Sequence, residues 1–265
     1  MKDLITIAKI CFRERIFSSK DSFIRINEPE MAMSLEEQVQ GFEVASAANG
    51  PLAPVQCFAS WNASKAIKHS TKILELGCGT GHVVTKMAYM NPDKKFIALD
   101  LSEGMLRQAE NLSMAMGLEN IEFFLGDMTD LSQFQNCGID AVTTSLALHH
   151  LRSEEDLIKT FKSIKKLIGE EGAFSFYDLG KLKHQASIVD FISMHDNHTP
   201  VYIEDTMNSF QAGFTKKDFS KALVESGLKK RSTLKVTLVV PAFLKAHSEL
   251  HPLDQIQKAR FNKFL

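Results

Sequence analysis

The sequence has little of what marks a secreted, a membrane-spanning or a nucleic-acid-binding protein. Its four cysteines lie far apart and form no C-x-x-C pair, which argues against a zinc site or a disulfide framework and fits a reducing compartment. Its formal net charge is −1, and its lysines and arginines form short scattered clusters rather than a basic stripe. No apolar run approaches the length of a membrane span, and the run at residues 4–12 lacks the h-region and cleavage site of a signal peptide. We therefore expect a cytoplasmic protein with neither a membrane nor a nucleic acid as partner.

The most informative segment reads I-L-E-L-G-C-G-T-G and carries Gly77, Gly79 and Gly81 at alternate positions. An apolar run that ends in glycines before a helical stretch is typical of a strand that passes to a helix through a tight turn, where a ligand approaches the backbone. The dinucleotide pattern G-x-G-x-x-G would need a glycine where His82 stands, and no Gly-Lys-Ser/Thr follows to make a P-loop. Glu75 instead brings a carboxylate to the cleft, which suits a ligand with an ammonium group and repels a pyrophosphate.

Three later apolar stretches are also predicted to be strands, and they end near Asp100, Asp127 and Ser145. Asp100 lies one strand–helix unit after the glycine turn, where an acid is positioned for two ribose hydroxyls. Strand-terminal aspartates also cap helices and turns. Asp100, followed by Ser102, fits such a helix start, and near Asp127 the cap could equally be Asp130.

These four strand ends resemble those of the class I S-adenosylmethionine (SAM)-dependent methyltransferases, over roughly residues 70–180. The resemblance implies SAM as the cofactor, with Asp127 at the adenine amino group and Met128 giving a backbone N–H to the ring. The predicted cofactor-binding residues are Glu75, Gly77, Cys78, Gly79, Gly81, Asp100, Leu101, Met105, Asp127, Met128 and Ser145. Cys78 is interpreted as a small buried residue, because no base is spaced to make it a nucleophile.

Strands and helices alternate from about residue 72 to 178, with helices expected at 82–90, 103–117 and 154–168. Together with the resemblance, this predicts an α/β fold with a Rossmann-like, doubly wound, seven-stranded sheet, mostly parallel with an antiparallel strand at one end. Two helices are expected before the first strand, one of them capped by Ser34. The expected parts are an N-terminal helical lid at 1–69, a SAM-binding domain at 70–241 with an acceptor-lid insertion at about 179–214, and a C-terminal tail at 242–265.

Histidines and an acid at the ends of the fourth and fifth strands are candidates for chemistry. A histidine near its ordinary pKa suits proton abstraction at neutral pH, although adjacent histidines point in different directions. The predicted catalytic residues are His149, His150 and Asp178. The predicted substrate-binding residues are His149, Tyr177, Tyr202, Asn208 and Phe210. His195 and His198 could bind a metal with Asp196, but no further ligand is suitably spaced, so no metal site is predicted.

The sequence thus predicts a SAM-dependent methyltransferase of the small-molecule type, with a small and partly apolar acceptor. Three alternatives stay open: a SAM-fold enzyme with chemistry other than methylation, a non-catalytic module that binds SAM or S-adenosylhomocysteine (SAH) and acts through partners, and a protein- or RNA-modifying enzyme. The His-His-Leu stretch at His149 is similar to that of quinone C-methyltransferases, but the rest of the chain departs from them. A homodimer is left open.

Overall fold

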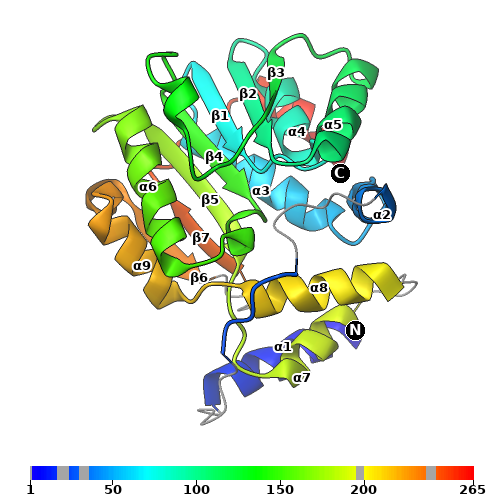
Figure 1. Cartoon of the computed structure of the whole chain (residues 1–265). Coiled ribbons are helices and arrows are strands. Elements are labelled where there is room, and N and C mark those ends of the chain that lie inside the picture. Colours follow the sequence, from blue (N-terminus) through cyan, green and yellow to red (C-terminus); the bar gives the residue numbers. More distant parts are fainter. Residues whose placement is uncertain (1, 17–23, 30–35, 195–199, 237–242) are drawn as a thin grey trace.

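The computed structural model describes residues 2–16, 24–29, 36–194, 200–236 and 243–265 (Figure 1). Its helices are α1 (Lys2–Ile16), α2 (Glu36–Ser46), α3 (Ala53–Ala66), α4 (His82–Met90), α5 (Glu103–Ala115), α6 (Glu154–Ile168), α7 (Gln185–Ile192), α8 (Pro200–Ala212), α9 (Lys216–Glu225) and α10 (Gln255–Phe261), with 3₁₀ turns η1 (Ser132–Phe134), η2 (Leu148–His150), η3 (Leu228–Arg231) and η4 (Asn262–Phe264). Its strands are β1 (Lys72–Leu76), β2 (Lys95–Asp100), β3 (Ile121–Leu125), β4 (Ala141–Ser145), β5 (Ala173–Leu179), β6 (Thr233–Val236) and β7 (Phe243–His247).

The strands of the described residues form one seven-stranded sheet in the order β3-β2-β1-β4-β5-β7-β6. β1 pairs in parallel with both β2 and β4, and β7 is antiparallel to both β5 and β6. The predicted fold class is therefore confirmed. Residues 243–247, expected in a C-terminal tail, instead form β7 between β5 and β6, so the domain boundary expected at residue 241 falls inside the sheet.

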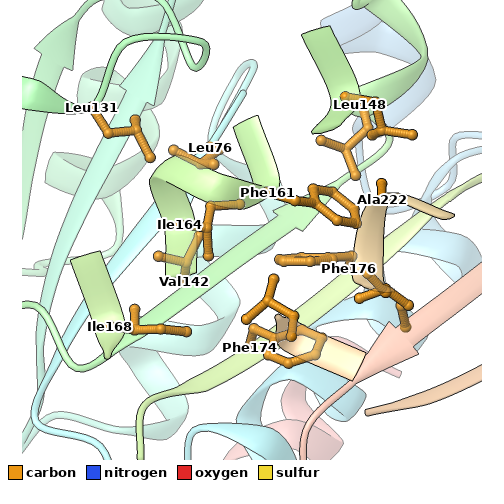
Figure 2. Packing of buried hydrophobic residues seen from close by; sticks show 14 of the residues in the cluster. Leu76, Leu131, Val142, Leu148, Phe161, Ile164, Ile168, Phe174, Phe176 and Ala222 are labelled. Atoms are coloured by element: carbon orange, nitrogen blue, oxygen red, sulfur yellow. The ribbon is translucent and has the colours of Figure 1, made fainter. Parts of the chain in front are cut away.

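Different helices cover the two faces of the sheet. On one face, α6 and α9 pack against the sheet, and Phe161 of α6 lies 4.9 Å from Phe176 of β5, measured between ring centroids (Figure 2). On the other face, α3 packs over β4 and β5 and α4 over β2, where Met87 and Phe96 are buried. Removal of these apolar side chains from water is the main force that holds the layers together.

Polar side chains at helix starts explain where several helices begin. Ser153 accepts a hydrogen bond from the Asp156 N–H at the start of α6, and Thr215 forms a capping box with Asp218 at the start of α9. The helices predicted at 82–90 and 154–168 coincide with α4 and α6. The cap expected at Ser34 lies outside the described residues.

The long connection after β5 forms α7 and α8, which lie with α1 beyond the carboxyl ends of the central strands (Figure 1). Asp190 of α7 forms ion pairs with Lys9 and Arg13 of α1, at 2.9 and 2.6 Å. The N-terminal helix and the insertion at 179–214, which the sequence places in separate lids, therefore pack together.

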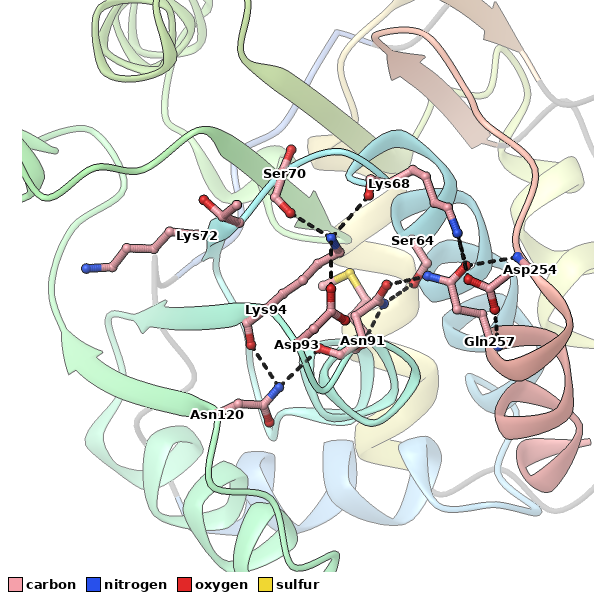
Figure 3. A network of polar contacts seen from close by, with 12 residues as sticks. Ser64, Lys68, Ser70, Lys72, Asn91, Asp93, Lys94, Asn120, Asp254 and Gln257 are labelled. Atoms are coloured by element: carbon pink, nitrogen blue, oxygen red, sulfur yellow. Dashed lines mark hydrogen bonds and ion pairs between the residues drawn. The ribbon is translucent and has the colours of Figure 1, made fainter.

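A buried polar network joins α10 to the end of α4 (Figure 3). Asn91 is completely buried, and its Nδ2 donates to the Met87 carbonyl at 2.8 Å and to the Ser64 hydroxyl at 3.2 Å. Its Oδ1 accepts a hydrogen bond from Nε2 of Gln257 in α10 at 2.7 Å. One side chain thus links three helices.

We expect Asn91→Ala to lower the free energy of unfolding by about 2–3 kcal/mol, because it leaves the buried Gln257 amide without its acceptor. Urea unfolding followed by circular dichroism measures this change. Asn262→Ala, at an exposed asparagine after α10, is the matched control and should have little effect. Equal losses in the two variants would contradict the role given to the network.

Candidate active site

The glycine turn between β1 and α4 has the backbone conformation that the sequence predicts. Gly77, Gly79 and Gly81 have φ angles of +64°, +54° and +83°, which residues with a side chain rarely adopt. A Cβ on Gly77 would lie 2.3 Å from the Cβ of Ala147, so the turn packs closely against the loop after β4. The Gly79 N–H donates to Oδ2 of Asp100 at 2.7 Å, which ties the turn to the end of β2.

A cavity of about 970 Å³, counted to its open mouth, lies over this turn at the carboxyl edge of the sheet, and we call it the turn cavity. Every predicted cofactor-binding residue except Gly81 lines it: Glu75, Gly77, Cys78, Gly79, Asp100, Leu101, Met105, Asp127, Met128 and Ser145. Gly81 instead faces α5, where an added Cβ would lie 2.8 Å from the Cβ of Ala109. The predicted set therefore comes together around one space.

The alternative role of the strand-terminal aspartates, as caps of the next helix or turn, holds for the turns but not for the helix starts. Ser102 caps α5, since its hydroxyl accepts a hydrogen bond from the Met105 N–H at 3.3 Å. Asp130 accepts from the Ser132 N–H at 3.0 Å at the start of η1. Asp100 and Asp127 are not the N-caps of α5 and η1, but each accepts a backbone N–H in a turn. The donors are Ser102 at 3.0 Å and Thr129 at 2.7 Å. Both aspartates also line the turn cavity.

Buried groups in the turn cavity fit a cationic ligand. Glu75 is 1% exposed, and its Oε2 accepts a hydrogen bond from the Thr143 hydroxyl. Its Oε1 and the Ser145 hydroxyl have no hydrogen-bond partner among the described residues. Burial raises the pKa of Glu75 to about 8, against the opposing effect of Thr143. An ammonium group, such as that of SAM, would satisfy the free oxygen and favour the ionised carboxylate.

A second cavity, the lid cavity, adjoins the first and measures about 930 Å³, counted to its open mouth. Much of its wall is apolar and comes from Pro51, Leu52, Pro54, Val55, Leu179, Phe191, Phe210 and Phe243. Phe42, Leu146 and His150 line both cavities, so a ligand in one lies next to a ligand in the other.

The structure places some of the predicted substrate-binding residues at the lid cavity and others away from both cavities. Tyr202 and Phe210 line the lid cavity, as does His149. Tyr177 lines neither cavity, because its ring is stacked behind that of Phe243 at a centroid distance of 5.2 Å. Asn208 also lines neither, although it lies on the same helix as Tyr202.

Of the predicted catalytic residues, His149 and His150 line the polar end of the lid cavity, whereas Asp178 lies against His149 and lines neither cavity. His149 is 3% exposed, and its Nδ1 lies 2.6 Å from Oδ1 of Asp178. Burial alone would lower the pKa of His149, but the carboxylates of Asp178 and Glu28 raise it to about 9. At pH 7 the ring is therefore protonated in this state, and it is not the free general base that the sequence predicts.

An N-terminal strap, residues 24–29, contacts η2 and α8 beside the lid cavity, and sequence reasoning missed it. Its Arg25 donates hydrogen bonds to the carbonyls of His149, Leu151, Arg152 and Ala212, and its guanidinium lies 4.1 Å from the ring centroid of Phe214. The strap has no helical or strand periodicity, so no local pattern in the sequence identifies it.

Two acidic residues in this region were also missed. Glu28 of the strap contacts Nδ1 of His150 through Oε2, and its Oε1 accepts from the Ser209 hydroxyl at 2.6 Å. Burial alone would raise the pKa of Glu28, but His150, His149 and Ser209 lower it to about 2. Asp205 of α8 lines the lid cavity, where burial and then the charge of Glu28 raise its pKa to about 6. His195, Asp196 and His198, weighed as metal ligands, lie outside the described residues.

The family model described as a methyltransferase domain matches residues 67–240. The chain belongs to this methyltransferase family. The methyltransferase is 25% identical over 158 residues to a tRNA (guanine-N(7)-)-methyltransferase of Lacticaseibacillus casei, covering 54% of this chain and 73% of that one. It is 27% identical over 147 residues to a carboxy-S-adenosyl-L-methionine synthase of Campylobacter fetus, covering 54% and 59%. It is 32% identical over 113 residues to a demethylmenaquinone methyltransferase of Leptospira interrogans, covering 42% and 44%, so it spans about half the length of these last two.

Solved structures share the fold of the methyltransferase at low sequence identity. A SAM-dependent methyltransferase from Aquifex aeolicus has a TM-score of 0.54 and 15% identity, over 80% of this chain and 96% of that one. The plantazolicin methyltransferase BpumL, solved with a desmethyl-plantazolicin analogue and SAH, has a TM-score of 0.59 and 12% identity, over 95% and 99%. The predictions of a class I SAM-dependent methyltransferase and of SAM as its cofactor are confirmed.

Proposed function

We propose that this methyltransferase transfers the methyl group of SAM to a small, partly apolar acceptor held in the lid cavity. The observation that carries the proposal is the pair of adjacent cavities, which share Phe42, Leu146 and His150. A largely apolar lining with a few polar side chains is typical of small-molecule sites.

Residues of the turn cavity would hold the cofactor. Glu75 binds the methionine ammonium directly or through water, and the glycine turn passes under the methionine and the ribose. Asp100 binds the ribose hydroxyls, while Asp127 and Met128 bind the adenine. SAM supplies an electrophilic methyl group on its sulfonium.

The protein's own contribution to the reaction is to orient the acceptor and exclude water. The apolar wall of the lid cavity holds the body of the acceptor, and His149, His150 and Asp205 hold its polar group. Alignment of the reacting atoms at contact distance supplies a large share of the rate acceleration in reactions of this kind.

Two of the relatives bear on the alternative functions, namely RNA modification and chemistry other than methylation. One is named as a tRNA methyltransferase, but a net charge of −1 and scattered basic residues do not favour RNA as the acceptor here. Another is named as a carboxy-SAM synthase, which keeps chemistry other than methylation as an outcome of the test.

The proposed location is cytoplasmic. The four cysteines all lie in the described residues and form no disulfide there, which supports a reducing compartment. Separately, none of the helices in the described ranges combines the length and the apolar character that a membrane crossing requires.

Transfer of labelled methyl groups from SAM into a cell extract, separated by molecular size, tests the proposal. We expect label in the small-molecule fraction, and at least a tenfold loss with Thr206→Trp, whose indole fills part of the lid cavity. Val224→Trp, at a 58% exposed position on α9, is the control and should keep full activity. Label in RNA or protein alone, or none with the wild type, would contradict the proposal.

The protonation state of Glu75 gives a second prediction, which concerns proton release when the cofactor product binds. Because its pKa is about 8 in the free protein, Glu75 is mostly protonated at pH 7 and must ionise to bind an ammonium. We expect SAH binding at pH 7 to release about one proton, and affinity to rise as the pH approaches 8. Calorimetry in two buffers of different ionisation enthalpy measures the release, which should disappear in Glu75→Gln. Equal heats for the wild type in both buffers would show that Glu75 does not meet the ammonium.

A further inference from the structure

Three side chains at the polar end of the lid cavity have no role in holding SAM as proposed above. Glu28 comes from the strap, while His149 and His150 come from η2. One oxygen or ring nitrogen of each lies within 4.8 Å of those of the other two. Asp205 lines the same cavity and adds a negative charge.

We propose that Glu28, His149 and His150 bind a divalent transition-metal cation in the lid cavity. Two imidazoles and one carboxylate are a ligand set that suits Zn²⁺ or Fe²⁺, whereas Mg²⁺ and Ca²⁺ prefer oxygen ligands. With three protein ligands, the cation keeps an open position.

The orientation of His149 supports this assignment. Its Nδ1 is held by Oδ1 of Asp178 at 2.6 Å, which leaves Nε2 directed toward Glu28, 3.8 Å from Oε1. Metal-binding histidines commonly donate their other ring N–H to a carboxylate in this way. Zinc bonds of about 2.0–2.2 Å place two tetrahedral ligand atoms about 3.4 Å apart, so this pair needs to close by only a few tenths of an ångström to bind a cation.

The other two ligands are positioned in a comparable way. The Ser209 hydroxyl donates to Oε1 of Glu28 at 2.6 Å and fixes the carboxylate. The rings of His149 and His150 lie 4.3 Å apart, and Nδ1 of His150 contacts Oε2 of Glu28. A cation bound between these atoms separates His150 from Glu28 and is held by both.

The open position faces the lid cavity, because His149 and His150 both line it. Resting on the proposed function, we assign to the cation an acceptor with a hydroxyl group. The hydroxyl oxygen binds the cation and loses its proton to solvent, then forms a bond to the methyl carbon as the carbon–sulfur bond breaks and its electron pair stays on sulfur. The products are a methyl ether, SAH and one proton.

The test is calorimetric titration of chelator-treated protein with Zn²⁺, without any acceptor. We expect one Zn²⁺ to bind per chain and the affinity to fall at least tenfold in Glu28→Gln. Because Glu28 does not line the turn cavity, a preserved SAH-induced thermal shift shows that this variant is folded. His251→Gln is the matched control, since His251 and His69 form a histidine pair elsewhere, with ring centroids 4.5 Å apart, that could itself bind zinc.

Binding that is absent, or that is lost in His251→Gln but not in Glu28→Gln, overturns the site. The role in the reaction is tested separately by the labelled-methyl assay. Loss of transfer after chelation, with recovery on adding Zn²⁺ or Fe²⁺, supports it. Full transfer by chelated wild-type protein would overturn the role of the cation while leaving the proposed methyl transfer standing.

Discussion

Asp100→Ala is expected to abolish the thermal stabilisation that SAM gives to the wild type while leaving the fold intact. Its carboxylate orders the glycine turn through the Gly79 N–H at 2.7 Å and is proposed to hold the ribose. Hydrogen bonds to a charged group contribute about 1.5–3 kcal/mol each, so the loss of two from the ribose predicts at least about a hundredfold weaker binding.

The fold should survive this substitution, because Asp100 contributes only one backbone hydrogen bond, from the Ser102 N–H at 3.0 Å, to the start of α5. Ser102 caps that helix through the Met105 N–H, and β2 keeps its pairing with β1 and β3. Asp130→Ala is the matched control: this aspartate also accepts a backbone hydrogen bond in a turn, but it does not line the turn cavity. If Asp100→Ala and the control bind SAH equally well, the assignment of the turn cavity to SAM is wrong.

Arg25→Ala is expected to lower the free energy of unfolding by about 3 kcal/mol. Its guanidinium donates to four carbonyls, two of them in η2 and the residue after it, and stacks on Phe214. Because Arg25 is only partly buried, we expect the lost free energy of unfolding to be smaller than the summed contributions of its four hydrogen bonds. Denaturant unfolding measures the change.

Arg25→Lys keeps the positive charge but removes the planar guanidinium, so it shows which of the two stabilises the fold. An ammonium cannot reach several carbonyls at fixed angles, so this variant should lose most of the same stability. Arg107→Ala, at a side chain that is 70% exposed, controls for the loss of a positive charge and should be near neutral. A loss in Arg25→Ala no larger than in Arg107→Ala would show that the contacts of Arg25 do not stabilise the fold.

The sequence predicts the turn cavity well because its residues follow local rules. Gly77 and Gly79 are needed by a backbone with positive φ, and Asp100 ends a strand whose apolar character is evident. Strands that pair in parallel end at one edge, so these residues meet without any further information about distant contacts.

The lid cavity follows from contacts between distant segments, which a single sequence does not reveal. Glu28 and His150 are in contact although more than a hundred residues separate them in the sequence. The strap that carries Glu28 has no helical or strand periodicity. Phe243 belongs to a strand that pairs antiparallel with β5, and its side chain takes the cavity position expected for Tyr177. The stretch that contains Phe243 has a mixed composition, so only its pairing shows that it is part of the sheet.

A crystal structure of the protein with SAH tests the central claim most directly. We expect the adenosine in the turn cavity between Asp100 and Asp127, the ammonium at Glu75, and the sulfur at the boundary formed by Leu146 and His150, facing the lid cavity. A sulfur that faces solvent or a closed wall, or SAH bound elsewhere, would contradict methyl transfer to an acceptor in the lid cavity.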